Sequence, residues 1–151
     1  MSHPPGAMTA TVFVLNGPNL NLLGTREPEV YGRDTLDDIA AMLTKRAGEL
    51  GIELDIRQSN HEGHLIDWLH EAAASEAKAV ILNAGGYTHT SVALRDAVRA
   101  IDVPVIEVHL SDPAKREPFR HTNFLSDVCK QSITGLGARG YILALDAAAA
   151  L

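Results

Sequence analysis

The sequence has little of several features that would mark a particular class of protein. Its 151 residues include one cysteine, Cys129, so no internal disulfide can form and no CxxC pair is present to hold zinc. No apolar run approaches the roughly 20 residues that a membrane-spanning helix needs. We therefore expect a protein of a reducing compartment, the cytoplasm, that does not enter a membrane.

Basic charge is also scarce. There are 13 lysines and arginines against 19 acidic residues, a net charge of -6 at pH 7. This balance argues against general binding to nucleic acid or to anionic membranes, although a local basic pocket remains compatible with it. Hydrophobic residues make up 46% and charged residues 21%, a composition typical of a globular protein.

The first ten residues differ from the rest. They have neither the basic nor the apolar region of a secretory signal, and we expect residues 1–10 to be a disordered or tag-like tail. The remaining residues show no internal repeat, linker or shift in composition. They predict a single domain over residues 11–151, catalytic if the loops described below form a site.

Short apolar runs predict the strands. The runs at 11–15, 79–82 and 103–108 are nearly continuous, which is typical of parallel strands covered on both faces. Residues 52–57 alternate apolar with charged side chains, which favours an edge strand. A short fifth strand is expected at 129–134.

Helical spacing fills the intervals between these runs. A helix is expected at 36–50, after a cap at Asp34 or Thr35 and before a stop at Gly51, with others near 65–72, 94–101 and 136–151. The alternation predicts an α/β, flavodoxin-like three-layer sandwich with a five-stranded parallel sheet of order 2-1-3-4-5. In such a sheet ligands bind beyond the carboxyl ends of the strands, here between the first and third.

Polar loops follow the expected strands on that side of the sheet. Residues 16–21, 83–91 and 107–113 supply amides, hydroxyls and imidazoles with little apolar material. Gly85 and Gly86 allow a ligand close to the backbone, and a cap at Thr90 or Ser91 would open a helix whose N–H groups attract anions. Such features are also ordinary in structural loops, so a pocket for an anion is one of two interpretations.

The segment 24–32 predicts a long loop, a common form of active-site lid. It contains Arg26 and Tyr31, and a guanidinium beside a phenol favours the phenolate, which can act as a general base. In the alternative interpretation, Tyr31 packs on the core and Arg26 pairs with Glu27 or Glu29.

The histidines suggest two different environments. His61, His64 and His70 fall at the start of the second helix without the carboxylates that a metal site would add, and we expect them on the surface. His109 ends an interior strand, where an imidazole is either a proton donor or a hydrogen-bonded core residue. No lysine stands out as the desolvated amine that an imine mechanism needs.

Taken together, these motifs resemble the type II 3-dehydroquinate dehydratases over about Val12 to Asp146. The resemblance rests on Asn-Gly-Pro-Asn-Leu-Asn-Leu-Leu-Gly-Thr-Arg-Glu-Pro from Asn16 with Tyr31-Gly32, Asn-Ala-Gly-Gly-Tyr-Thr-His-Thr-Ser from Asn83, Glu-Val-His-Leu-Ser from Glu107, and Arg-Glu-Pro-Phe-Arg from Arg116. It implies a lyase of the shikimate pathway, in aromatic amino acid biosynthesis, that dehydrates 3-dehydroquinate to 3-dehydroshikimate by anti elimination through an enolate. It also implies no metal or organic cofactor, and a homododecamer built as a tetramer of trimers.

The resemblance assigns roles by position. Tyr31 would remove the C2 proton, Arg26 would keep Tyr31 ionised, Asn19 would orient a water at the enolate oxygen, and His109 would protonate the leaving hydroxyl. The residues implied to bind substrate are Asn83, His89, Leu110, Ser111 and Arg120, with Asp96 contributed by a neighbouring subunit. The motif positions Tyr87, Thr122 and Asn123 carry no assigned role.

Other functions remain open on the residues alone. A flavodoxin-like electron carrier or nucleotide-binding module would have a Ser/Thr/Gly-rich loop after the first strand, where this chain has Gly-Pro-Asn-Leu-Asn. A phosphoacceptor domain would have acidic residues where Asn16 and Asn19 stand. A scaffold without activity is a third alternative. The same dehydration also serves quinate breakdown, so the direction of the pathway is left open.

Overall fold

A computed structural model describes residues 9–25 and 27–151, so the predictions for residues 1–8 and for Arg26 lie outside the described residues. The chain forms a five-stranded, all-parallel sheet of order β2-β1-β3-β4-β5, which confirms the predicted order. The strands are β1 (Thr11–Asn16), β2 (Glu53–Gln58), β3 (Ala79–Asn83), β4 (Val105–His109) and β5 (Gln131–Thr134).

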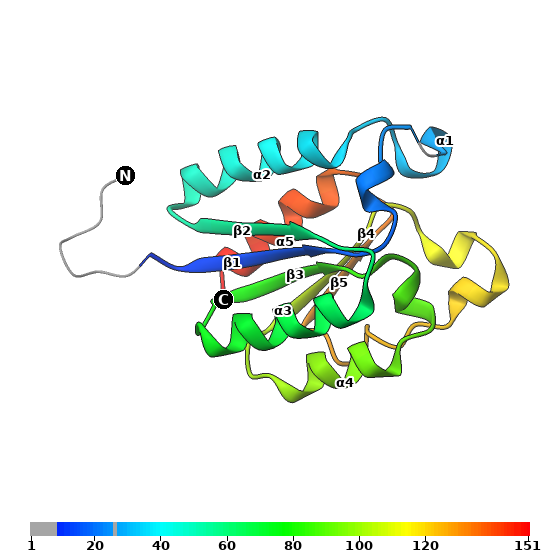
Figure 1. The fold of residues 1–151 in the computed structure, drawn as a ribbon. Helices are drawn as coiled ribbons and strands as arrows, with labels where there is room; N and C mark the ends of the chain where they lie inside the picture. The colour runs from blue at the N-terminus through cyan, green and yellow to red at the C-terminus, as the bar shows by residue number, and fades with distance from the viewer. Residues whose placement is uncertain (1–8, 26) are drawn as a thin grey trace.

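Four long helices cover the two faces of the sheet. Figure 1 shows α2 (Leu36–Leu50) and α5 (Arg139–Ala149) on one face, and α3 (Glu62–Ala74) and α4 (Val92–Ala100) on the other. Each face has its own core, one built from α2 and α5 side chains and the other from α3 and α4 side chains. Both cores bury side chains of β1, β3 and β4, which is why those strands read as continuous apolar runs.

Local chemistry sets several boundaries. Thr35, and not Asp34, caps α2: its hydroxyl accepts the Asp38 N–H, and the Asp38 carboxylate accepts the Thr35 N–H. Strand β4 begins at Val105, later than expected, because Pro104 has no N–H to give to a ladder. Helix α5 begins at Arg139 and not near residue 136, because Gly135 and Gly137 have φ of +76° and +59°.

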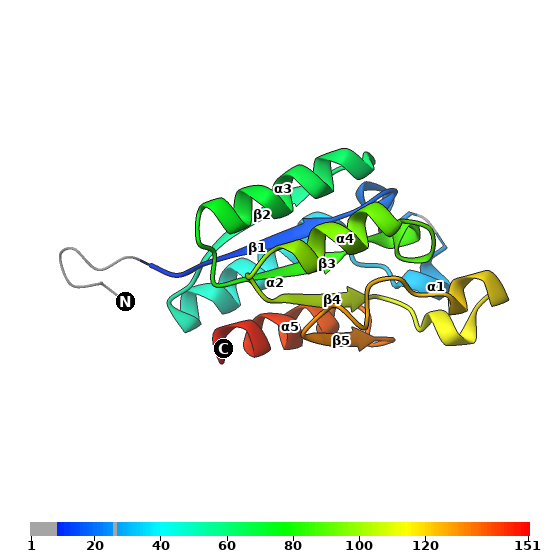
Figure 2. The same cartoon turned by 90° about the horizontal axis from the view of Figure 1, so that it is seen from below.

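Short helices at the carboxyl ends of the strands were not predicted by hydrophobic periodicity. The loop at 24–32 contains a one-turn helix, α1 (Pro28–Tyr31), and four 3₁₀ turns lie at 20–22, 85–89, 113–115 and 118–121. Figure 2 shows α1 beside the segment that follows β4. One turn is too short for a periodic apolar pattern, so the sequence alone could not reveal them.

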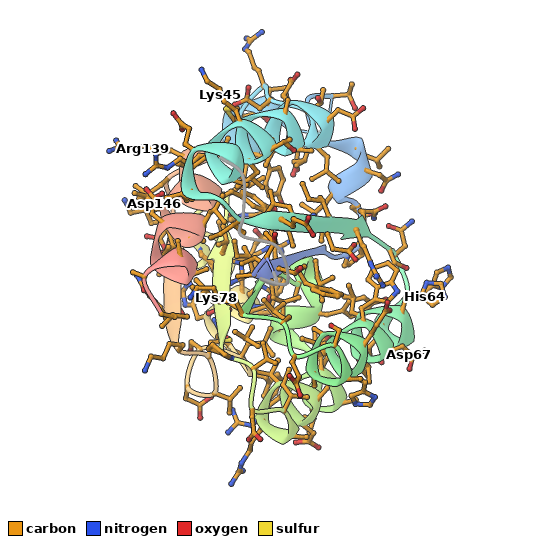
Figure 3. The ribbon with its side chains drawn as sticks, turned by 90° about the vertical axis from the view of Figure 1, so that its left-hand side faces the viewer. Lys45, His64, Asp67, Lys78, Arg139 and Asp146 are labelled. Atoms are coloured by element: carbon orange, nitrogen blue, oxygen red, sulfur yellow. The ribbon has the colours of Figure 1, made fainter. Side chains whose placement is uncertain are left out.

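The outer faces of α2 and α3 are polar and solvated. In Figure 3 the side chains of Lys45 on α2 and of His64 and Asp67 on α3 lie on the outside. His61 and His70 are exposed as well, as expected for surface histidines. No helix in the described part of the chain is long and apolar enough to span a membrane.

Candidate active site

A pocket opens at the carboxyl ends of β1, β3 and β4, where the strand order predicted a ligand site. Its walls come from the loops after these three strands and from α1. The lining residues are Pro18, Asn19, Leu20, Tyr31, Asn83, Gly85, Gly86, His89, His109, Leu110, Ser111, Pro113, Arg116 and Arg120. In Figure 1 this is the end of the sheet that carries α1.

Most of the residues proposed from the sequence meet in this pocket. Eight line it: Asn19, Tyr31, Asn83, His89, His109, Leu110, Ser111 and Arg120. Asp96 does not, because it is exposed on α4. Neither Thr90 nor Ser91 lines the pocket; the Ser91 hydroxyl instead caps α4 by accepting the Leu94 N–H at 2.8 Å. At that helix start the structure shows the capping interpretation.

Tyr31 contacts an arginine that the sequence analysis had not assigned a role. Arg116 Nη1 donates to Tyr31 Oη at 2.8 Å, and the guanidinium carbon lies 5.0 Å from the centre of the Tyr31 ring. The same Nη1 lies 3.4 Å from the Ser111 hydroxyl. Tyr31 also packs against the α2/α5 core, so the packing alternative is correct for its ring while its hydroxyl faces a cation. A phenolate at this position would be held by a charge-assisted bond.

His109 is paired with a buried carboxylate. His109 Nε2 lies 2.7 Å from Glu107 Oε2, and the Glu107 side chain is only 1% exposed. A carboxylate can only accept here, so Nε2 carries a proton and the neutral ring has its lone pair on Nδ1.

The Glu107 carboxylate is held ionised by its surroundings. Burial alone would raise the pKa of Glu107, but hydrogen bonds from His109, Ser132 and Asn123 together outweigh burial and hold that pKa below its usual range. Ser132 Oγ donates at 2.6 Å and Asn123 Nδ2 at 3.0 Å. Asn123, left without a role in the sequence analysis, therefore orients the partner of His109. The sequence did contain a sign that Glu107 has a function, because it is a charged residue inside the apolar run of β4.

His89 uses the other ring nitrogen for its hydrogen bond to the protein, so its Nε2 is the nitrogen left for the pocket. Its Nδ1 lies 2.7 Å from the backbone oxygen of Thr122, which can only accept, so Nδ1 carries the proton. Partial burial lowers the pKa of His89 and favours the neutral ring. Neutral His89 then offers Nε2 as a hydrogen-bond acceptor, which suits a substrate hydroxyl.

Asn19 lies on a strained turn that the neighbouring loop holds in place. Its φ is 68°, in the left-handed region, and its N–H donates to Asn60 Oδ1 at 3.0 Å. Asn60 Oδ1 also accepts from Gln58 Nε2 at 3.1 Å, and the Asn60 backbone oxygen accepts the Tyr87 hydroxyl at 2.7 Å. Asn60 thus ties together the loops after β1, β2 and β3.

Two arginines line the pocket although the chain is acidic. Glu117, outside the lining, lies 3.1 Å from Arg120 and 3.7 Å from Arg116. No lysine lines the pocket within the described residues, and none of their acidic, histidine or cysteine side chains form a group of three that could hold a metal ion. The guanidinium groups of Arg116 and Arg120 suit a small anion, and the Tyr31 and His109 side chains suit acid–base chemistry.

Comparison with known proteins gives a consistent result. Residues 10–149 match the sequence profile of the family described as dehydroquinase class II. The chain is 57% identical over 140 residues to the 3-dehydroquinate dehydratase of Rhizobium johnstonii, covering 93% of this chain and 96% of that protein, and 58% identical over 141 residues to that of Hyphomonas neptunium, covering 93% and 94%. The crystal structure of the type II dehydroquinase from Butyrivibrio crossotus superposes with a TM-score of 0.91 at 40% identity, covering 93% of this chain and 97% of that one. The chain belongs to the class II dehydroquinase family and is a hydro-lyase, as its motifs predicted.

Proposed function

We propose that this chain removes water from 3-dehydroquinate to give 3-dehydroshikimate, a step of the shikimate pathway, by anti elimination through an enolate. The observation that carries this proposal is the presence in one pocket of a tyrosine bonded to a cation and a histidine bonded to a carboxylate. Tyr31 Oη is held by Arg116 at 2.8 Å, and His109 is held by Glu107 at 2.7 Å. An elimination next to a ketone needs a base and an acid, and these pairs supply one of each.

Tyr31 is the base in this mechanism. Removing the C2 proton next to the ketone leaves an enolate, and the phenolate that takes the proton is stabilised by Arg116. The resemblance gives Arg26 the same task; it lies outside the described residues, so its role remains a proposal. Asn19, on the turn held by Asn60, orients a water that donates to the enolate oxygen.

His109 is the acid. With Nε2–H donated to Glu107, the proton that His109 delivers leaves from Nδ1 and departs with the hydroxyl as water. The electron pair of the enolate then forms the new carbon–carbon double bond. Glu107 stabilises the imidazolium before the transfer and keeps the ring in one orientation.

The remaining lining residues bind the substrate. The Ser111 hydroxyl and the N–H groups of Leu110 and Ser111 hold the carboxylate, while His89 and Arg120 bind ring hydroxyls. Asp96 completes the pocket from a neighbouring subunit of a homododecamer, which accounts for its exposure on α4. The single cysteine supports a cytoplasmic location.

The test is to add 3-dehydroquinate and follow the ultraviolet absorbance of the enone product. Folded protein that gives no signal from neutral to alkaline pH would refute the proposal. For Tyr31→Phe, which keeps the ring that packs on the core, we expect kcat to fall far more than KM changes, because the base acts in the transition state. Borohydride added with substrate should not inactivate the enzyme; inactivation would instead indicate a lysine imine.

A further inference from the structure

A fully buried tyrosine on the C-terminal helix contacts the floor of the pocket. Tyr141, on the first turn of α5, has 0% exposure and belongs to the α2/α5 core. Its hydroxyl donates to Asn16 Oδ1 at 2.7 Å and accepts from Asn83 Nδ2 at 2.9 Å. Asn16 and Asn83 end the neighbouring strands β1 and β3 and are paired in register. Nothing in the motifs or in the proposed roles uses Tyr141.

The orientation of the Asn16 carboxamide decides which group donates in each of these hydrogen bonds. Asn16 Nδ2 donates to the backbone oxygen of Arg57 at 3.1 Å, so its Oδ1 must face Tyr141. The one hydroxyl proton of Tyr141 goes to that oxygen, and the Tyr141 oxygen must therefore accept from Asn83. Asn83 Oδ1 in turn accepts the Gly85 N–H at 3.2 Å. The carboxamide of Asn83 has one allowed orientation as a result.

Burial and packing stabilise the position and the protonated form of the Tyr141 hydroxyl. Burial raises the pKa of Tyr141 well above its usual range, which favours the protonated hydroxyl as the donor to Asn16. The start of α5 packs directly on the sheet: a Cβ at Gly140 would be in van der Waals contact with Ile133 at 3.4 Å and Val108 at 3.6 Å. This packing places the Tyr141 hydroxyl at the ends of β1 and β3.

We propose that Tyr141 is a positioning residue: it orients the Asn83 carboxamide so that the second Nδ2–H is available to the substrate in the pocket. Asn83 lines the pocket and is only 3% exposed, so a rotated amide would present its oxygen in place of a donor. This inference rests on the proposed function, because it concerns how the same pocket meets 3-dehydroquinate. Without the Tyr141 oxygen, a buried amide N–H of Asn83 loses its acceptor, and only the bond from the Gly85 N–H still fixes the orientation of the carboxamide.

The experiment compares Tyr141→Phe, Asn83→Ala and the double variant in the enone assay. We expect Tyr141→Phe to lower kcat/KM about 10-fold, the scale of one hydrogen bond in the transition state. The fall in kcat/KM of Tyr141→Phe should come from kcat and from KM in the same proportion as the fall in Asn83→Ala. The double variant should be no slower than Asn83→Ala alone, because Tyr141 acts through Asn83. Losses that multiply in the double variant, or unchanged kinetics in folded Tyr141→Phe, would overturn the inference.

Two further measurements separate positioning from general stability. Ala144→Gly changes a fully buried position of the same helix and should lower the melting temperature, because glycine destabilises a helix interior. It should leave kcat/KM within about twofold of wild type, because the Tyr141 hydroxyl is still present. If Tyr141→Phe does not fold, NMR of the wild type decides: a Tyr141 hydroxyl proton in fast exchange with water would overturn the inference, and a slowly exchanging one would support it. An inactive wild type refutes the proposed function instead, so the two failures are distinguishable.

Discussion

At the scale of single residues, Glu107 ties the stability of the fold to pH. Its pKa lies below the usual 4.5 despite burial, because His109, Ser132 and Asn123 all donate to it. The unfolded chain therefore binds this proton at a higher pH than the folded chain does. The stabilising contribution is complete above the unfolded pKa and is lost as the pH falls through the folded pKa.

Glu107→Gln tests this linkage. A glutamine can turn its oxygen toward His109 and Asn123 and let the Ser132 hydroxyl accept, so the geometry is kept and the charge is lost. We expect the difference in unfolding free energy between wild type and variant to be constant from pH 6 to 8 and to narrow below about pH 4.5. Urea unfolding at each pH measures it. Glu53→Gln, at the exposed start of β2, should show a much smaller difference throughout; a difference for Glu107→Gln that widens in acid would contradict the argument.

Arg116 is the second prediction at this scale. It donates to Tyr31 Oη, stacks on the Tyr31 ring and reaches Ser111, three contacts that depend on a planar guanidinium. Lysine supplies only a point charge, so Arg116→Lys should lower kcat/KM by about 10-fold and Arg116→Met by about 100-fold or more. Steady-state kinetics in the enone assay measures both. Arg139→Lys, at an exposed position of α5, is the control, and equal activity in Arg116→Met and wild type would remove Arg116 from the mechanism.

At the scale of elements, the sequence predicted the strands and long helices, whose apolar patterns follow from burial. It did not predict the one-turn helices or the contacts that they make. The runs that became β1, β3 and β4 are apolar because both faces of the sheet are covered, and the polar loops beyond them do form the pocket. The Arg116–Tyr31 contact joins residues 85 positions apart, one in the one-turn helix α1 and one in the bend between two 3₁₀ turns, and no local pattern encodes it. Likewise, capping chemistry and an anion site look alike in sequence, and at Ser91 the capping role is the one observed.

Asn60 gives the prediction that belongs to this scale. Its side chain accepts the Asn19 N–H and its backbone oxygen accepts the Tyr87 hydroxyl, so one residue outside the pocket lining links the loops after β1, β2 and β3. Asn60→Ala should lower kcat/KM about 10-fold, because the left-handed turn at Asn19 loses its partner. Asn60→Asp, which keeps the accepting oxygen, should recover most of the activity. If neither variant differs from wild type, the turn is held by other contacts.

At the scale of the whole molecule, the position of Asp96 raises the question of how many chains make one site. Its carboxylate is exposed on α4 and does not line the pocket of its own chain. If a neighbouring subunit supplies Asp96, then each site takes Tyr31 from one chain and Asp96 from another. Tyr31→Phe and Asp96→Ala then remove groups that different chains contribute to the same site. Subunits mixed in equal amounts, dissociated in mild denaturant and reassembled should form sites in which Tyr31 and Asp96 are both intact. For random assembly about one quarter of the sites would be restored, since each of the two positions is intact with a chance of about one half.

The control is the mixture of the same two proteins without dissociation, which should stay at the low activity of the separate variants. Asp96→Ala should lower activity without changing the melting temperature, because the residue is solvated on its own chain. Size-exclusion chromatography with light scattering shows whether the reassembled species has the size of a dodecamer. A reassembled mixture no more active than its parents would place Asp96 outside the site, and each chain would then hold a complete pocket. Recovery near one quarter would mean that the pocket at the end of β1, β3 and β4 functions only when subunits meet, so dilution should lower activity wherever it separates them.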